Sequence, residues 1–438
     1  MIFDLKIIYL IFVYNRKVTI EYNACPMGNL KTDAKEEKEE IDMNKKLLKI
    51  VSVIITPILI LALSTCIMLK DVPDHLYTSS EVEVMSALPN VGPFNKVEYK
   101  EEKLKVNLLG LIPIKQVSVH KVKNIEVIPG GNCIGVRLSS QGVLVVGFSE
   151  IAIANDRKIS PAGEAGIEVG DVILKIDGEA IETSHDLIKK VSSINKEKIN
   201  IELLRDGKNL NKEVTLVKEG NSGYKLGLWV RDSTAGVGTM TFYDEKTGKF
   251  AALGHPVTDG DTNKPFTIKK GDLLQSSIIS VRKGEKGAPG ELKGIFVNDD
   301  KPIGSIVKNT QCGIFGEGKK AECNPMRSSP MKVAFRDEIK LGKATIITTI
   351  DEEGPKEYEI EIVKLLQQDS PGPKSMLIKV TDETLLSKTG GIVQGMSGSP
   401  IIQNGKLVGA VTHVLINKPD VGYGIYIDWM LEDAGILK

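Results

Sequence analysis

A glycine-rich turn near the C-terminal end of the chain carries the residue types that nucleophilic catalysis requires. Ser397 stands between Gly395 and Gly398 in the run Gln-Gly-Met-Ser-Gly-Ser-Pro, which lies between two apolar segments. A serine hydroxyl is a weak nucleophile at neutral pH, so it needs a tight turn, a neighbouring base and backbone N–H groups that face the developing oxyanion. The two glycines permit such a turn and leave space for a substrate carbonyl. We therefore predict that Ser397 is the nucleophile and that the N–H groups of Gly395 and Ser397 form an oxyanion hole.

A general base has to lie beside this serine, and the sequence holds five histidines. His255 follows a strand-like run in the motif Ala-Leu-Gly-His-Pro, far enough before Ser397 for two loops of a double β-barrel to meet. We therefore predict His255 as the general base. His413 lies on the apolar run after the serine, and we expect it either to contact substrate in the cleft or to pack in the core. The other three are expected to be solvated or structural: His75, His120 and His185.

The acid that would orient the imidazole is less clearly marked in the sequence. A carboxylate is needed to hold the histidine ring and to stabilise its cation. Asp382 lies shortly before the serine, whereas the analogy with chymotrypsin places the acid nearer the middle of the interval between histidine and serine. The residues alone therefore leave several other aspartates open for this role: Asp259, Asp272, Asp299 and Asp337.

Residues 127–219 carry a second pattern, that of a small β-rich module. Residues 160–181 predict a short helix that starts with proline, then a strand and an Asp-Gly turn. A helix from about Ser184 to Ser193 and a hairpin over residues 198–214 follow. The string Ala-Gly-x-x-x-Gly-Asp-x-Ile-x-x-x-Asp-Gly in this region resembles the PDZ domains that are appended to bacterial proteases.

Such a module is expected to bind peptide. PDZ domains take up an extended chain end by adding it to a sheet edge. We expect this edge at Ile134, Gly135 and Val136, facing the helix that begins near Ser184. A β-rich spacer that binds nothing is the alternative.

The N-terminal region predicts a membrane anchor. Residues 50–69 carry no charge and have about the twenty residues that a bilayer crossing needs. Lys45, Lys46 and Lys49 precede them, which places the N-terminus in the cytoplasm and the rest of the chain outside. Translation is expected to start at Met43, so that residues 1–42 are a non-native or disordered extension. A cleaved signal peptide is the competing interpretation.

Composition excludes several classes of function. Lysine plus arginine and aspartate plus glutamate number 57 each, so the net charge gives no indication of a nucleic-acid partner. The five cysteines include no Cys-x-x-Cys pair, so we expect no structural zinc, and nothing in the sequence implies a cofactor. Cys312 and Cys323 could pair in an oxidising exterior or remain free thiols.

These patterns together predict a mainly β chain with an N-terminal transmembrane helix, a PDZ-like domain and a chymotrypsin-like double β-barrel. Abundant glycine and few aromatic residues suit strands that are joined by tight turns. The predicted divisions are an extension over residues 1–42, a basic segment and membrane helix over 43–70, a stalk with a small β unit over 71–126, the PDZ-like domain over 127–219 and the peptidase domain over 220–438.

Three motifs together resemble one family. Ala-Leu-Gly-His-Pro, Lys-Thr-Gly-Gly-Ile-Val-Gln-Gly-Met-Ser-Gly-Ser-Pro and Val-Gly-Ala-Val-Thr-His-Val, behind a PDZ-like domain and one membrane helix, are similar to the stage IV sporulation protein B family of serine peptidases. The resemblance covers residues 43–438. It implies that Ser397 and His255 are catalytic and that Asp382 is the third member of the triad.

The resemblance also implies a role in sporulation. Members of this family are exported across the inner forespore membrane, cleave themselves and signal across the intermembrane space. Their target is an inhibitory partner of a membrane-embedded metalloprotease, whose release leads to processing of a mother-cell sigma factor. The expected partners are therefore the chain itself as substrate, this inhibitory protein and the membrane, and self-cleavage could release the catalytic part.

Two alternatives belong to other functional classes. The chain could be a non-catalytic PDZ adaptor with a degenerate peptidase-like domain. It could also be an HtrA-like quality-control protease, although such enzymes place the PDZ domain after the peptidase domain and this chain places it before.

Overall fold

The N-terminal helix and part of a small sheet belong to the first of two units into which the chain divides. The computed structural model describes residues 33–69, 72, 75–78, 95–100, 102–121, 124–152, 158–218, 223–318, 329–366, 368 and 370–437. Helix α2 (Asp33–Leu69) includes Pro57 and begins within the predicted N-terminal extension, whose first 32 residues lie outside the described ranges. Within the described ranges, no helix has both the length and the apolar character to cross a bilayer.

A four-stranded sheet follows α2 in the sequence, where the sequence predicts a small β unit. Its order is β1-β4-β3-β2. Successive residues of a strand point to opposite faces, and β2 accordingly alternates between half-buried and exposed side chains. The strands are β1 (His75–Thr78), β2 (Asn95–Lys100), β3 (Lys103–Leu108) and β4 (Ile112–Lys121).

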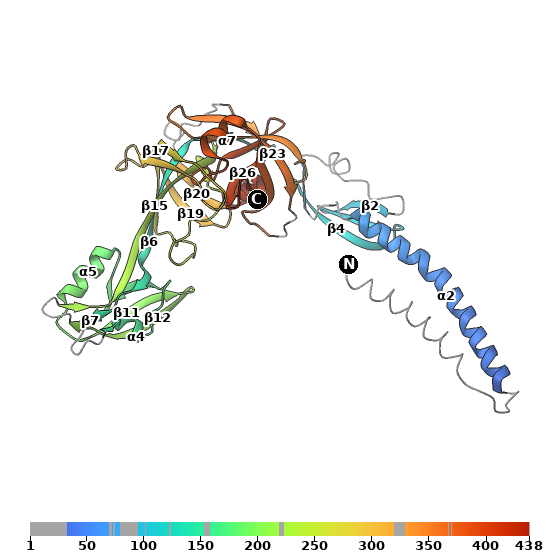
Figure 1. The fold of residues 1–438 in the computed structure, drawn as a ribbon, viewed down its shortest axis with the longest axis horizontal. Coiled ribbons are helices and arrows are strands. Elements are labelled where there is room, and N and C mark those ends of the chain that lie inside the picture. The colour runs from blue at the N-terminus through green and yellow to red at the C-terminus, as the bar shows by residue number, and fades with distance from the viewer. Residues whose placement is uncertain are drawn as a thin grey trace. The chain divides into compact units, whose positions relative to one another are not determined.

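Two long strands, β6 (Cys133–Phe148) and β15 (Leu228–Asp244), organise the rest of the chain. They pair antiparallel along most of their length (Figure 1). One end of the pair belongs to the PDZ-like module, where β6 pairs with β9 (Val172–Ile176). The other end belongs to a six-stranded ring. Both modules are thus built on the same two strands.

The first ring contains the strand that leads to His255. Its order is β6-β17-β19-β20-β16-β15, and it closes because β15 also pairs with β6. A buried apolar cluster that includes Phe250 and Leu273 fills it. The remaining ring strands are β16 (Lys249–Ala252), β17 (Lys270–Arg282), β19 (Gly304–Thr310) and β20 (Gly313–Gly318), with β5 (Glu126–Pro129), β18 (Glu291–Phe296) and β21 (Met331–Lys332) at its sides.

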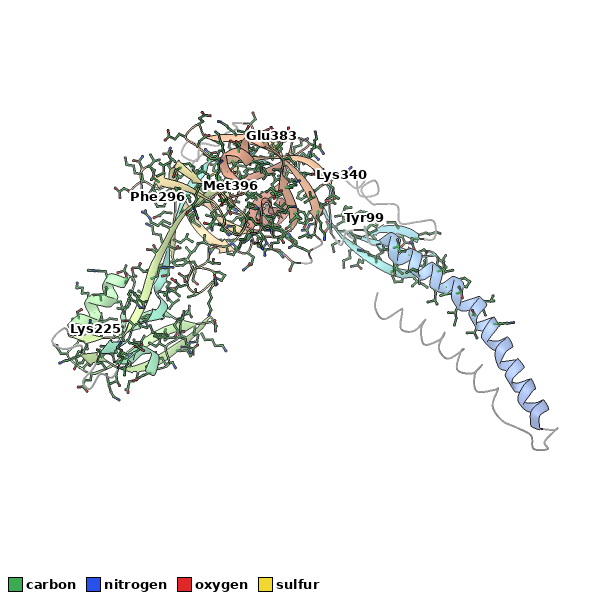
Figure 2. The ribbon with its side chains drawn as sticks, in the orientation of Figure 1. Tyr99, Lys225, Phe296, Lys340, Glu383 and Met396 are labelled. Atoms are coloured by element: carbon green, nitrogen blue, oxygen red, sulfur yellow. The ribbon has the colours of Figure 1, made fainter. Side chains whose placement is uncertain are left out.

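The second ring contains the serine turn and is a closed barrel of order β22-β23-β24-β27-β26-β25. Met396, beside the serine, is fully buried in its core (Figure 2). The two rings confirm the predicted double β-barrel. The elements are β22 (Gly342–Thr349), β23 (Pro355–Leu365), β24 (Met376–Val380), β25 (Pro400–Gln403), β26 (Lys406–Leu415), β27 (Lys418–Tyr426), α7 (Glu383–Thr389) and α8 (Ile427–Asp433).

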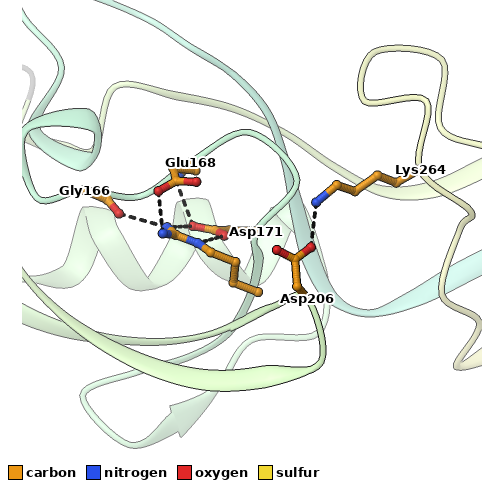
Figure 3. Close-up of polar contacts among 6 residues, drawn as sticks. Gly166, Glu168, Asp171, Asp206 and Lys264 are labelled. Carbon is orange, nitrogen blue, oxygen red and sulfur yellow. Dashed lines mark hydrogen bonds and ion pairs between the residues drawn. The ribbon is translucent and has the colours of Figure 1, made fainter. Parts of the chain in front are cut away.

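The PDZ-like module is held together by its own apolar core and by one arginine. Arg205 donates to both carboxylate oxygens of Asp171 at 2.7 Å, to the carbonyl oxygen of Gly166 and to Glu168 (Figure 3). The module contains β7 (Ile151–Ala152), β8 (Lys158–Ile159), α4 (Pro161–Glu164), β10 (Glu179–Ala180), α5 (Ser184–Ser193), β11 (Lys198–Arg205), β12 (Lys208–Thr215), β13 (Val217–Lys218) and β14 (Tyr224–Lys225). The predicted helix and hairpin of this module are both present.

Candidate active site

One cleft of about 540 Å³ brings together the residues that the sequence singled out for chemistry. Ser397, Gly395 and His413 line it from the second ring, and His255 lines it from the first. Residues 234–237 of β15 form part of the same wall. The predicted nucleophile, the predicted base and both residues predicted to supply oxyanion donors therefore line a single cleft, although His255 is far from the other two in the sequence.

Two threonines of β15 hold the serine turn in its tight shape. Gly395 and Gly398 have φ angles of 97° and 95°, in the region that favours glycine. Thr239 donates from Oγ1 to the carbonyl oxygen of Gly395 and from its backbone N–H to the carbonyl oxygen of Ser397. Thr241 donates from Oγ1 to the carbonyl oxygen of Gly398 at 2.8 Å. The turn of the second ring is thus fixed by a strand of the first.

The N–H groups of Gly395 and Ser397 are available to a ligand. Neither donates a backbone hydrogen bond within the described part of the chain, whereas the flanking N–H groups of Met396 and Gly398 do. The Ser397 hydroxyl donates to the carbonyl oxygen of Thr412 at 2.7 Å. The two N–H groups can therefore donate hydrogen bonds to an oxyanion. The hydroxyl is hydrogen-bonded to strand β26.

His255 is placed by a tight turn at the end of β16. Leu253 and Gly254 both have φ angles of 69°. A Cβ on Gly254 would come within 2.9 Å of Thr412, so this glycine allows the two rings to approach closely. The Nδ1 atom of His255 lies 2.8 Å from the carbonyl oxygen of Pro256, to which it donates in the Nδ1–H tautomer. That tautomer leaves Nε2 free to accept a proton.

Burial keeps both cleft histidines neutral. It lowers the pKa of His255 below its usual value, since a buried cation loses hydration. Burial also lowers the pKa of His413 to about 4, with further contributions from the neighbouring His255 and Lys374. The imidazole rings of His255 and His413 lie 4.9 Å apart between their centroids. A neutral His255 is the form that a general base requires.

Asp382 occupies a different position from the one its predicted role needs. It is the N-cap of α7, where its carboxylate accepts from the backbone N–H groups of Leu385 at 2.9 Å and Glu359 at 3.3 Å. It is absent from the lining of the cleft. Its role as third member of the triad therefore remains a prediction that this arrangement does not support.

The alternative aspartates also have other partners. Asp259 pairs with Arg231 and accepts two backbone N–H groups, and Asp272 pairs with Arg137. The backbone carbonyl of Asp299 accepts from Arg137. Asp337 lies outside the cleft lining, and burial raises the pKa of its carboxyl to about 6. Among the described residues, the ring of His255 hydrogen-bonds only to Pro256.

The predicted peptide-binding edge is wrong. Ile134, Gly135 and Val136 lie in β6, where they pair with β17 on one side and with β15 on the other. Both backbone edges are thus occupied, and no peptide can be added there. Val136 instead lines the catalytic cleft. The prediction failed because the sequence gives no sign that one unbroken strand passes from the first ring into the PDZ-like module.

The threonines that support the serine turn were not among the residues predicted from the sequence. Thr239, Thr241 and Thr412 are almost fully buried, and each donates its hydroxyl to a backbone carbonyl. A threonine within an apolar strand has to find a partner when it is buried, which is the signal that could have drawn attention to them.

Two further predictions concern the cysteines and metal binding. Cys312 is buried, and burial raises the pKa of its thiol. Cys323 lies outside the described residues, so its pairing with Cys312 stays a prediction. No group of three or more metal-ligating side chains occurs in the part of the chain that the structure describes.

Protein-family models match both the peptidase region and the PDZ-like module. A family model described as SpoIVB peptidase S55 matches residues 222–431, and a PDZ domain model matches residues 132–216. A DegP-like periplasmic serine endoprotease of Brucella suis is 31% identical over 134 residues, which is 28% of this chain and 25% of that protein. A DegP-like protein of Pseudomonas fluorescens is 32% identical over 132 residues, 28% of each chain. The chain thus spans about a quarter of the length of these relatives.

Solved structures with some likeness include proteases and a PDZ domain. The active form of the Rv3671c protease of Mycobacterium tuberculosis has a TM-score of 0.28 at 13% identity, over 47% of this chain and 74% of that one. The PDZ domain of an SdrC-like protein from Listeria monocytogenes has a TM-score of 0.17 at 22% identity, over 21% of this chain and 90% of that one. The family match and the serine protease relatives together support a serine endopeptidase.

Proposed function

This chain belongs to the SpoIVB family of serine peptidases with a PDZ domain, and from that premise we propose that it acts by limited proteolysis in the signalling of endospore formation. The observation that carries the proposal is the cleft in which Ser397, His255 and two unoccupied N–H groups meet. These are the parts that peptide-bond hydrolysis by a serine needs. The expected partners remain the chain itself and an inhibitory protein that controls a membrane-embedded metalloprotease.

The chemistry follows from the positions of these groups. The Ser397 hydroxyl turns from the carbonyl of Thr412 toward His255, which accepts its proton as the oxygen attacks the scissile carbonyl carbon. The N–H groups of Gly395 and Ser397 stabilise the oxyanion. His255 then gives the proton to the leaving amine as the C–N bond breaks. Water, deprotonated by His255, hydrolyses the ester and restores Ser397.

A backbone carbonyl is proposed to orient the base. The carbonyl oxygen of Pro256 accepts from Nδ1 of His255 and fixes the tautomer. It carries no full charge, so it stabilises the imidazolium less than a carboxylate does. A base held in this way suits an enzyme that makes few cuts slowly.

The location of the enzyme is also proposed from the sequence. The uncharged residues 50–69, preceded by Lys45, Lys46 and Lys49, support a membrane anchor with the catalytic part exported. The family relationship supports the intermembrane space of the forespore as the compartment, and cleavage after the anchor would release the catalytic part.

Self-cleavage is the most direct test. The full chain is prepared as wild type, Ser397→Ala and His255→Ala, and fragments are mapped by intact mass. Discrete N-terminal trimming in the wild type only is expected. If all three stay intact and a fluorophosphonate fails to label the wild type, the chain is not a serine peptidase and the adaptor alternative takes its place.

The DegP-like relatives favour a second candidate, a quality-control protease. An unfolded model protein distinguishes the two. Degradation to many short fragments would support quality control, whereas one or two discrete cuts would support signalling.

A further inference from the structure

Strand β15 presents one backbone edge that begins at the PDZ-like module and ends in the catalytic cleft. From Leu228 to Thr239 it pairs with β6 on one side, with register shifts between Trp229 and Val230 and between Arg231 and Ser233. On its other side, no strand in the described ranges pairs with it until Met240, where its pairing with β16 starts. An unpaired edge of this length is a template for an added strand. The first ring and the PDZ-like module thus share one possible docking edge.

The backbone groups of this edge face the cleft. Thr239 donates its N–H to the carbonyl of Ser397, and its own carbonyl accepts from Leu253, so both groups point away from β6. Backbone groups alternate in direction along a strand, and the pairing with β6 shows no register shift between Ser233 and Thr239. Val237 and Ala235 therefore direct their N–H and C=O groups to the same side as Thr239.

The cleft end of the edge is open. Residues 234–237 line the cleft beside Ser397. A Cβ built on Gly236 would meet no atom within 4 Å, so a neighbouring chain has room to approach the backbone there.

The other end of the edge carries exposed apolar side chains. Trp229 is 63% exposed and lies over Gly147 of β6, while Leu228 and Val230 pack on the core of the PDZ-like module. Helix α5 is tied to this end, because Ser184 donates from its backbone N–H and its hydroxyl to the carboxylate of Asp232. The same helix exposes Ile188, which is 64% accessible. An added strand would find cross-strand partners here.

The direction of proton transfer indicates which part of a substrate lies along this edge. His255 delivers a proton to the leaving amine, so the segment after the scissile bond lies on the side of His255. That histidine belongs to the first ring, the ring of β15. The acyl part remains on Ser397, whose hydroxyl contacts β26 of the second ring. The leaving segment is therefore the one that faces β15.

We propose that the substrate segment that follows the scissile bond binds as an added strand along β15, from Val237 in the cleft to Trp229 beside α5. This inference rests on the proposed function and adds a substrate requirement to it. The edge from Val237 to Trp229 corresponds to about eight residues, or roughly 26 Å of strand. The enzyme should therefore prefer extended substrates with at least about eight residues after the cut. The far end of that segment would contact the PDZ-like module.

Matched peptides test the length requirement. One cut by the full chain is mapped in an unfolded protein such as β-casein, and two synthetic peptides are made with the same six residues before the cut and either three or twelve after it. The longer peptide is expected to have a kcat/KM at least about tenfold higher, which corresponds to about 1.4 kcal/mol. Equal values for the two peptides would overturn the inference and leave the proposed function intact. If β-casein is not cut, the peptides are built on the self-cleavage site instead; absence of self-cleavage as well would overturn the proposed function and this inference with it.

Substitutions of exposed residues test whether the length preference depends on the end of the edge beside α5. Trp229→Ser and Ile188→Ser should reduce the ratio of the two kcat/KM values severalfold. Val307→Ser is the control, because Val307 on β19 is 61% exposed and lies outside the cleft lining. It should leave the ratio unchanged. If neither Trp229→Ser nor Ile188→Ser changes the ratio of the two kcat/KM values, docking beside α5 is contradicted.

Backbone methylation tests strand addition without turnover. A fluorescein-labelled form of the longer peptide is titrated against the full chain with Ser397→Ala, and each amide after the cut is N-methylated in turn. Binding should weaken at least about fivefold at every second position, because only alternate N–H groups of an added strand face its partner. A uniform effect at all positions would contradict strand pairing.

Discussion

The hydroxyl of Ser397 donates a hydrogen bond of 2.7 Å to the carbonyl oxygen of Thr412, one residue before His413 on β26. The serine side chain is thus held by the second ring, while His255, its proposed base, belongs to the first. In the proposed mechanism the hydroxyl exchanges this carbonyl for His255. The bond joins the hydroxyl to a backbone carbonyl of the cleft wall.

Removal of this hydroxyl should abolish catalysis and leave the fold intact. Ser397→Ala deletes the nucleophile and one neutral hydrogen bond, which contributes about 1 kcal/mol to stability. We expect no labelling by a fluorophosphonate and no cleavage, with the free energy of unfolding lower by about 1 kcal/mol. Urea denaturation and labelling measure the two effects. Retained labelling would show that another residue is the nucleophile.

Activity should persist in mildly acidic solution. Burial lowers the pKa of His255, so its imidazole stays neutral below the ordinary histidine value of about 6.5. The protonated form is the inactive one, and the acid limb of kcat/KM should accordingly have its midpoint below pH 6.5. The rate of fluorophosphonate labelling between pH 4 and pH 9 reports this midpoint. A midpoint above pH 7 would indicate that a carboxylate stabilises the cation.

Asp382 can be tested as a helix cap and as a catalytic acid in one experiment. Asparagine caps helices about as well as aspartate, whereas alanine costs about 1 kcal/mol. If Asp382 acts only as the cap of α7, Asp382→Asn should retain stability and activity, and Asp382→Ala should lose about 1 kcal/mol of stability. Unfolding curves and kcat/KM are measured for both. A large loss of activity in Asp382→Asn, with stability retained, would establish Asp382 as the third member of the triad.

The sequence predicted the parts of the site that depend on local residue types. Ser397, Gly395 and His255 lie in short motifs whose chemistry can be read without a fold, and the cleft brings them together. The edge at Ile134 failed because it depends on which strands pair on either side of β6. Strand partners are set by contacts between residues far apart in the chain, which local patterns do not record.

The same limit applies to the orienting group of the base. A carboxylate was expected from analogy, whereas the observed partner of His255 is the backbone carbonyl of Pro256. Every residue has a carbonyl, so no residue type could have indicated this one. The fold class was easier to predict, because alternating apolar residues and frequent glycine turns occur throughout residues 220–438.

A buried ion pair at the end of the second ring should be the most sensitive point for stability. Arg336 donates from Nε to Asp428 at 2.6 Å, and its guanidinium lies 3.8 Å from the ring centroid of Trp429. The Asp428 side chain is fully buried. Arg336→Met leaves this carboxylate without its cation, so we expect a loss of about 3 to 5 kcal/mol in the free energy of unfolding.

A double substitution separates the ion pair from general packing. Arg336→Met combined with Asp428→Leu removes both charges, and well-packed apolar replacements of buried pairs are often neutral. The double variant should therefore be more stable than Arg336→Met alone, by at least about 2 kcal/mol in urea denaturation. Lys264→Met is the control, because Lys264 and Asp206 form an exposed pair, for which a change within about 0.5 kcal/mol is expected. If the double variant is no more stable than Arg336→Met, the loss of stability comes from lost packing against Trp429 and not from the unpaired Asp428 carboxylate.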